Sequence, residues 1–230
     1  MSISPVSAAP TGHRASYPAA VLWDMDGTLL DSERLWDVAV DELCSELGFP
    51  MTTELRESTL GNSTVDALTK VFDAAGIPAT HRDYPATDRW LRNRVHELFA
   101  LGLPWRPGAL EALDIVAAQG IPMALVTNTV RELTEVALDT LGRHRFAATV
   151  CGDEVERGKP APDPYLRAAA LLGVDPRCCQ AIEDSAAGTA SATAAGCRTL
   201  VVPSAAPVPE GPRRVFRDSL DGLTPTDLLW

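Results

Sequence analysis

Short apolar segments alternate along this chain with stretches that have the hydrophobic spacing of helices. The apolar segments are residues 20–23, 121–127, 148–151, 179–182 and 198–202. Helices are indicated at residues 109–119, after Pro164 and at residues 186–195, with Gly173 and Gly196 as the stops of the last two. This alternation predicts an α/β fold in which a doubly wound parallel sheet carries helices on both faces.

One interval, residues 34–103, interrupts this alternation. It contains no convincing apolar strand but has amphipathic helical stretches at residues 35–47, 64–75 and 87–101. That is too much helix for a single crossover between two parallel strands. We therefore expect an inserted α-helical cap domain at 34–103, an α/β catalytic core at 20–33 and 104–230, and a flexible N-terminal tail at 1–19.

The amino-acid composition limits which binding partners and which cellular compartment are expected for this protein. The chain has 31 acidic and 20 basic side chains in 230 residues, a formal charge of −11, which disfavours binding to nucleic acid or to an anionic membrane surface. No apolar segment approaches the roughly twenty residues that cross a bilayer. Five cysteines, an odd number without a CxxC pair, and no signal-peptide pattern predict a cytoplasmic protein. We expect a monomer or a weak homodimer.

The first predicted strand runs into Asp24-Met25-Asp26-Gly27. Strand geometry places the side chains of Asp24 and Asp26 on the same side, where two anions repel unless a cation or a proton lies between them. Gly27 allows a sharp turn immediately afterwards. An isolated Asp-x-Asp-Gly is more often an ordinary turn, so this motif alone decides little.

Polar residues also follow two other predicted strands. Thr127 and Asn128 end the second strand, Lys159 precedes the fourth, and Glu183-Asp184 end the fourth. Each has an ordinary alternative: Thr127 and Asp184 as helix caps, and Lys159 as a solvated surface charge. Open α/β sheets, however, bind ligands at the carboxyl ends of their strands, where these groups converge.

Together these motifs resemble the haloacid dehalogenase superfamily. The resemblance covers about residues 21–202 and rests on Asp24-x-Asp26-Gly27-Thr28-Leu29-x-Asp31-Ser32-Glu33, Thr127-Asn128, Gly158-Lys159-Pro160-x-Pro162-Asp163-Pro164-Tyr165 and Glu183-Asp184-Ser185-x-x-Gly188. It implies a core strand order of 5-4-1-2-3. It also implies the small helical cap of the subgroup that contains phosphoglycolate phosphatases, sugar-phosphate phosphatases and β-phosphoglucomutases.

The resemblance also implies roles for the core residues. Asp24 is then the nucleophile that forms an aspartyl-phosphate, and Asp26 is the acid/base that protonates the leaving oxygen and later activates water. Thr127 and Lys159 hold the non-bridging phosphoryl oxygens.

A magnesium ion and a substrate pocket are implied in the same way. Mg²⁺ is held by Asp24, the backbone carbonyl of Asp26 and Asp184, with Glu183 assisting directly or through water. Substrate-binding candidates are Thr127, Asn128 and Lys159 of the core together with Asn62 and Ser63 of the cap. The expected activity is hydrolysis of a small phosphorylated sugar, polyol or hydroxy acid.

Three alternatives stay open. A phosphosugar mutase of this subgroup carries an arginine in the cap loop near the position of Thr64, so the absence of that arginine favours hydrolysis. A dehalogenase does not use an acid/base two residues after its nucleophile, so Asp26 argues against it. A non-catalytic binding module that retains the fold is the third alternative, and the intact acidic and basic motifs argue against it.

Overall fold

The structure, a computed structural model, describes residues 17–59, 64–204 and 206–229. Its centre is a parallel sheet of six strands in the order β3-β2-β1-β4-β5-β6. The strands are β1 (Ala20–Trp23), β2 (Met123–Val126), β3 (Ala148–Val150), β4 (Cys179–Glu183), β5 (Arg198–Val201) and β6 (Arg214–Phe216). The predicted α/β class is confirmed. Five strands have the implied order, and β6, which the sequence pattern did not predict, extends the sheet beyond β5.

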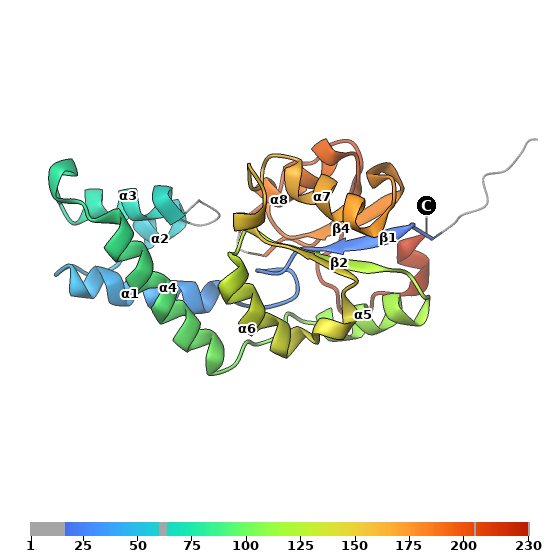
Figure 1. Cartoon of the computed structure of the whole chain (residues 1–230), viewed down its shortest axis with the longest axis horizontal. Coiled ribbons are helices and arrows are strands. Elements are labelled where there is room, and N and C mark those ends of the chain that lie inside the picture. The colour runs from blue at the N-terminus through green and yellow to red at the C-terminus, as the bar shows by residue number, and fades with distance from the viewer. Residues whose placement is uncertain (1–16, 60–63, 205, 230) are drawn as a thin grey trace, which may run out of the picture.

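Helices cover both faces of this sheet (Figure 1). The helices α7 (Asp163–Leu172) and α8 (Ala186–Ala195) pack on one face, and α5 (Ala109–Ala118) and α6 (Arg131–Leu141) pack on the other. Side chains of β1 alternate accordingly: Leu22 contacts the α7 and α8 side, whereas Trp23 contacts the α5 and α6 side. Each buried side chain of this size contributes about 1.5–3 kcal/mol of hydrophobic stabilisation.

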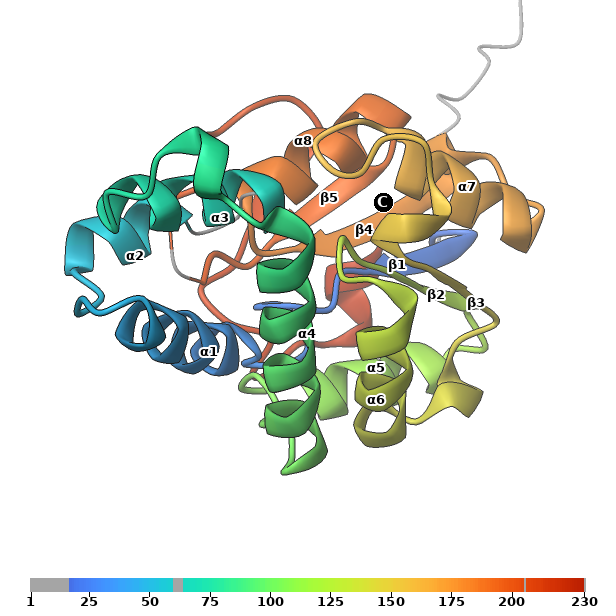
Figure 2. The same cartoon turned by 60° about the vertical axis from the view of Figure 1, so that its left-hand side comes forward.

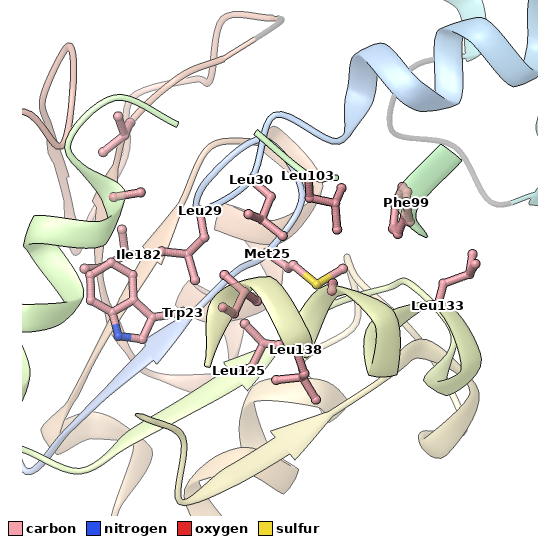
Figure 3. Close-up of a cluster of buried hydrophobic side chains, with 14 of the residues drawn as sticks. Trp23, Met25, Leu29, Leu30, Phe99, Leu103, Leu125, Leu133, Leu138 and Ile182 are labelled. Carbon is pink, nitrogen blue, oxygen red and sulfur yellow. The ribbon is translucent and has the colours of Figure 1, made fainter. Parts of the chain in front are cut away.

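The apolar cluster that contains Trp23 extends past the end of β1. Met25, Leu29 and Leu30 continue it toward Leu125 and Leu133, as Figure 3 shows, and all five of these side chains are buried. The turn that follows β1 is therefore anchored by its own hydrophobic residues, and Asp24 and Asp26, which alternate with them, point the other way.

A second group of helices lies between β1 and α5 in the chain and to one side of the sheet (Figure 1). It consists of α1 (Glu33–Glu46), α2 (Thr53–Thr59), α3 (Thr64–Ala74) and α4 (Tyr84–Ala100). Helix α2 was not predicted from sequence because only Leu55 of its seven residues is buried, which leaves no periodic signal. Short 3₁₀ segments also occur, at Ala79–His81, Arg143–Arg145, Gly152–Glu154, Pro176–Cys178 and Pro225–Leu228.

The chain enters and leaves this helical group at one place. The amide of Asp31 donates to the carbonyl of Pro104 at 2.8 Å, and the amide of Arg106 donates to the carbonyl of Leu29 at 2.9 Å. Helix α4 also packs beside α6 of the core (Figure 2). The helical group is therefore held at the carboxyl end of β1. Among the helices of the described ranges, none has the length and apolar content needed to cross a membrane.

Candidate active site

Three carboxylates meet at the carboxyl ends of β1 and β4. Asp24 directly follows β1, Glu183 is the last residue of β4, and Asp184 is next in the chain. The two strands are hydrogen-bonded neighbours, so their ends are adjacent. One oxygen from each carboxylate lies within 4.8 Å of the others, and all three residues are buried, with at most 5% of their surface exposed. Such a cluster is unstable as three free anions and requires cations.

Lys159 supplies one of those cations. Its Nζ donates to Oδ1 of Asp24 and to Oε1 of Glu183, both at 2.6 Å, and to the carbonyl of Val126 at 2.8 Å. All three ammonium protons are thereby used. Burial alone would lower the pKa of Lys159, but the negative charges of Asp24 and Glu183 outweigh it and raise that pKa. Lys159 is therefore charged and aimed at Asp24.

Glu183 is held on every side. Its Oε1 accepts a second hydrogen bond, from the hydroxyl of Tyr165 at 2.6 Å, and its Oε2 accepts one from Ser185 at 3.2 Å. A Cβ at Gly188 would lie less than 3.0 Å from the carboxylate, so only glycine leaves room for it. Burial, followed by the charge of Asp24, raises the pKa of Glu183, and Lys159 opposes the shift.

Asp184 is contacted by uncharged hydroxyl groups, not by a lysine as Glu183 is, and it lies close to Asp24. Its Oδ1 is 3.4 Å from the hydroxyl of Thr28, and its Oδ2 accepts a hydrogen bond from Ser204. Burial and the charge of Asp24 raise the pKa of Asp184. Oδ2 of Asp24 is buried and has no hydrogen-bond partner within residues 17–59, 64–204 and 206–229. Gly27, at a φ of 84°, allows the Asp184 carboxylate to lie against the turn after β1, because a Cβ at Gly27 would overlap that carboxylate. Oxygen donors of this kind, left uncompensated, fit a hard divalent cation such as Mg²⁺.

Asp26 has a separate environment. Its Oδ1 accepts from the hydroxyl of Ser32 at 2.6 Å, and its Oδ2 accepts from those of Thr127 and Thr129, both at 2.8 Å. Burial and the negative charge of Asp24 raise the pKa of Asp26, and the three hydroxyls partly oppose that rise. The two aspartates therefore share no partner, although only one residue separates them.

The ordinary alternatives for these side chains do not hold. Lys159 is buried, with 4% of its side chain exposed, and is no solvated surface charge. Ser185 is the N-cap of α8, since its hydroxyl accepts from the amide of Gly188 at 3.1 Å, so Asp184 is not the cap. Thr127 does not cap α6, which starts at Arg131.

Asn128 supports the loop that carries Lys159. Its Oδ1 accepts from the backbone amide of Lys159 at 2.8 Å, and its Nδ2 donates to the carbonyl of Lys159 at 3.2 Å. Gly158 permits this contact, because a Cβ there would lie less than 3.0 Å from the Asn128 oxygen. The side chain thus contacts the Lys159 backbone, and its predicted contact with substrate stays a prediction. Asn62 and Ser63, the predicted cap contacts, lie outside the described residues.

Several polar contacts of the site were not assigned from sequence. Tyr165 and Ser32 lie within motifs that the sequence marks, and Thr129 directly follows one, yet their hydroxyl contacts with Glu183 and Asp26 need the folded geometry. Ser204 lies in a loop after β5 that carries no motif at all.

The site and the fold together define a family. The family model for haloacid dehalogenase-like hydrolases matches residues 18–196, most of the chain. The chain therefore belongs to the haloacid dehalogenase-like hydrolase family, as its motifs predict.

Particular proteins are similar to this chain over at least three quarters of its length. Hexitol phosphatase B of Escherichia coli (strain K12) is 34% identical over 91% of this chain and 96% of its own. A phosphorylated carbohydrates phosphatase of Thermotoga maritima is 32% identical over 77% of this chain and 81% of its own. The crystal structure of CbbY from Rhodobacter sphaeroides in complex with phosphate superimposes with a TM-score of 0.78 at 28% identity, covering 89% of this chain and 96% of that one.

Proposed function

We propose that this protein is a magnesium-dependent phosphatase that hydrolyses the phosphomonoester of a small sugar or polyol through an aspartyl-phosphate on Asp24. The chain is an enzyme of the haloacid dehalogenase-like hydrolase family, and the phosphatase names of its relatives confirm the predicted class, a phosphoric monoester hydrolase. One observation carries the finer proposal. Asp24, which clusters with Asp184, has one oxygen fixed by Lys159 and the other buried without a hydrogen-bond partner among the described residues.

Asp24 is suited to act as the nucleophile. A carboxylate oxygen attacks phosphorus with a free lone pair, and in the described part of the chain no hydrogen bond to the buried Oδ2 of Asp24 competes for it. Lys159 places its positive charge on Oδ1 and orients the carboxylate. The resulting acyl phosphate divides hydrolysis into two displacements.

We infer that Asp24, Asp184 and the backbone carbonyl of Asp26 hold the magnesium ion. When bound, Mg²⁺ offsets the negative charge of the carboxylates and of the phosphoryl oxygens. Glu183 was also predicted as a ligand. Its two oxygens already accept hydrogen bonds from Lys159, Tyr165 and Ser185, which favours a role in supporting Lys159.

Asp26 serves as the acid and then the base. Its raised pKa favours the protonated form that can donate to the departing ester oxygen, and its three hydroxyl contacts hold the carboxyl group beside the nucleophile's strand. Thr127, whose hydroxyl donates to Asp26, and Lys159 are the groups that we assign to the phosphoryl oxygens. Thr127 then exchanges its Asp26 contact for a phosphoryl oxygen when substrate binds.

The substrate class follows from the relatives and from the helical cap. The relatives are named a hexitol phosphatase and a phosphorylated carbohydrates phosphatase, and a cap over the strand ends favours small substrates. Thr64, the first residue of α3, stands where a phosphosugar mutase carries arginine, which favours transfer to water. We further propose a cytoplasmic protein that is a monomer or a weak homodimer.

A panel of phosphomonoesters tests this function. Purified protein is assayed for phosphate release from hexitol phosphates, hexose phosphates, phosphoglycolate and an aryl phosphate, with Mg²⁺ and with excess chelator. We expect turnover only with Mg²⁺ and the highest kcat/KM for a sugar or polyol phosphate. Full activity in chelator would refute the metal assignment. No turnover of any ester would instead favour the non-catalytic alternative.

A further inference from the structure

Tyr165 places a phenol hydroxyl against the active-site carboxylates from within helix α7. The residue is completely buried, and its hydroxyl donates to Oε1 of Glu183 at 2.6 Å. This is the same oxygen that receives the ammonium of Lys159 at 2.6 Å. The proposed reaction uses Lys159 and Asp24 directly but gives the Tyr165 hydroxyl no part.

Two donors on one oxygen restrict the motion of that carboxylate. Without Tyr165, Oε1 would keep only Lys159, and the other oxygen only the longer 3.2 Å contact from Ser185; a second short donor on Oε1, anchored on a packed helix, restricts rotation of the carboxylate about its terminal bond. The aromatic ring of Tyr165 also contacts Lys159 directly, with its centroid 5.3 Å from Nζ. Glu183 thus connects helix α7, through Tyr165, to the ammonium group of Lys159.

The position of the Lys159 ammonium depends on Glu183 because all three of its protons are hydrogen-bonded. Its three protons are shared among Asp24, Glu183 and the carbonyl of Val126. If the Glu183 oxygen moves, one proton loses its acceptor and the ammonium shifts away from Asp24.

We propose that Tyr165 is a positioning residue: its hydroxyl fixes Glu183 so that the ammonium of Lys159 stays aimed at Asp24 and at the phosphoryl group. This inference rests on the proposed function only in giving Lys159 a phosphoryl contact. The competing explanation is that Tyr165 merely fills the apolar layer that contains Leu22 and Ala168. Tyr165→Phe separates the two, because it keeps the ring and removes only the hydroxyl.

Lysine side-chain NMR provides a readout that does not depend on turnover. Lys70 and Lys159 are the only lysines in the sequence, so protein labelled with ¹⁵N at lysine Nζ gives at most two lysine ammonium signals. Lys159→Met assigns them. We expect the Lys159 signal to shift and to exchange faster with solvent in Tyr165→Phe, while the Lys70 signal stays unchanged. An unchanged Lys159 signal would overturn the proposal.

A matched control exists in the cap. Tyr84 is also a tyrosine whose hydroxyl is hydrogen-bonded, to Thr69 at 3.0 Å, and whose ring packs on a neighbour, Phe72. Tyr84→Phe removes the same group far from the carboxylates. It should leave the Lys159 signal and kcat unchanged, and a Lys159 shift equal to that of Tyr165→Phe would count against a local effect.

Kinetics complete the test. With Mg²⁺ and an aryl phosphate, Tyr165→Phe should lower kcat about tenfold, the scale of one hydrogen bond to a charged group. Because the hydroxyl acts through Lys159, the same substitution in a Lys159→Met background should cost less than twofold. An equal loss in both backgrounds would show a general packing role and refute the proposal. If the wild type has no turnover, the proposed function fails, and the NMR result still decides the role of Tyr165.

Discussion

Lys159→Met is the substitution that should reveal most about how the site is held together. Methionine keeps an unbranched apolar stem similar to that of lysine but lacks the terminal ammonium group. The change leaves Asp24, Glu183 and the carbonyl of Val126 without their common donor, inside a region from which water is largely excluded. Folding of the variant therefore has to tolerate buried carboxylates that have lost their counter-ion.

The magnitude follows from the two ion pairs. At an effective dielectric constant of about 20, charges 2.6 Å apart attract by roughly 6 kcal/mol per pair. The cost of desolvating the ammonium offsets most of this, and loss of one partner of a buried pair typically costs about 3–5 kcal/mol. We expect that loss in the free energy of unfolding measured in chelator. Added Mg²⁺ should restore part of it, because a divalent cation compensates the same carboxylates.

Urea denaturation of the wild type and two variants measures the effect. Lys70→Met is the control, since Lys70 donates to the carbonyl of Ser58 at an exposed position, and it should change stability by less than about 0.5 kcal/mol. A Lys159→Met deficit below about 1 kcal/mol, or one that Mg²⁺ does not reduce, would refute the view that Lys159 is the principal counter-ion of the cluster.

The other predictions concern the aspartates, a glycine and pH. Asp24→Asn should abolish turnover and form no phosphoenzyme. Asp26→Asn should retain turnover of aryl phosphates, lose a further factor on the order of 10²–10⁴ in rate with alkyl phosphates, and accumulate a phosphoryl group on the Asp24 peptide, which mass spectrometry detects. Equal losses for both esters would contradict these roles. Gly188→Ala should displace the Glu183 carboxylate, cost about 1–3 kcal/mol and lower kcat; unchanged denaturation and kinetics would show that the carboxylate can yield. The pKa values of Asp26, Glu183 and Asp184 are raised, so in chelator the ionised forms of these acids oppose folding. The thermal unfolding midpoint should therefore rise as pH falls from 7 toward 4.5, the ordinary pKa of a glutamate such as Glu183. The rise should be smaller with Mg²⁺. A midpoint that falls with acid equally in both conditions would contradict this reasoning.

Much of the architecture could be predicted because it depends on local spacing. The apolar run of β1, the glycine that ends α8 and the lack of an apolar strand pattern between 34 and 103 are properties of neighbouring residues, and they specified an α/β sheet with helices on both faces. Short elements with little burial escaped this reasoning. Helix α2 buries only Leu55, and β6 has three residues at the sheet edge, so neither leaves a periodic pattern.

The candidate site shows the same division. The residue types and their order along the chain marked Asp24, Lys159 and Asp184 as groups that meet at the strand ends, because parallel neighbouring strands end at one edge. Which oxygen receives which proton was decided by tertiary structure. Tyr165 reaches Glu183 because α7 packs across β1, β2 and β3, and Ser204 reaches Asp184 across a turn that Gly27 keeps open. Such contacts join residues distant in the chain, so they depend on the packing distances between helices and strands, which no local pattern specifies.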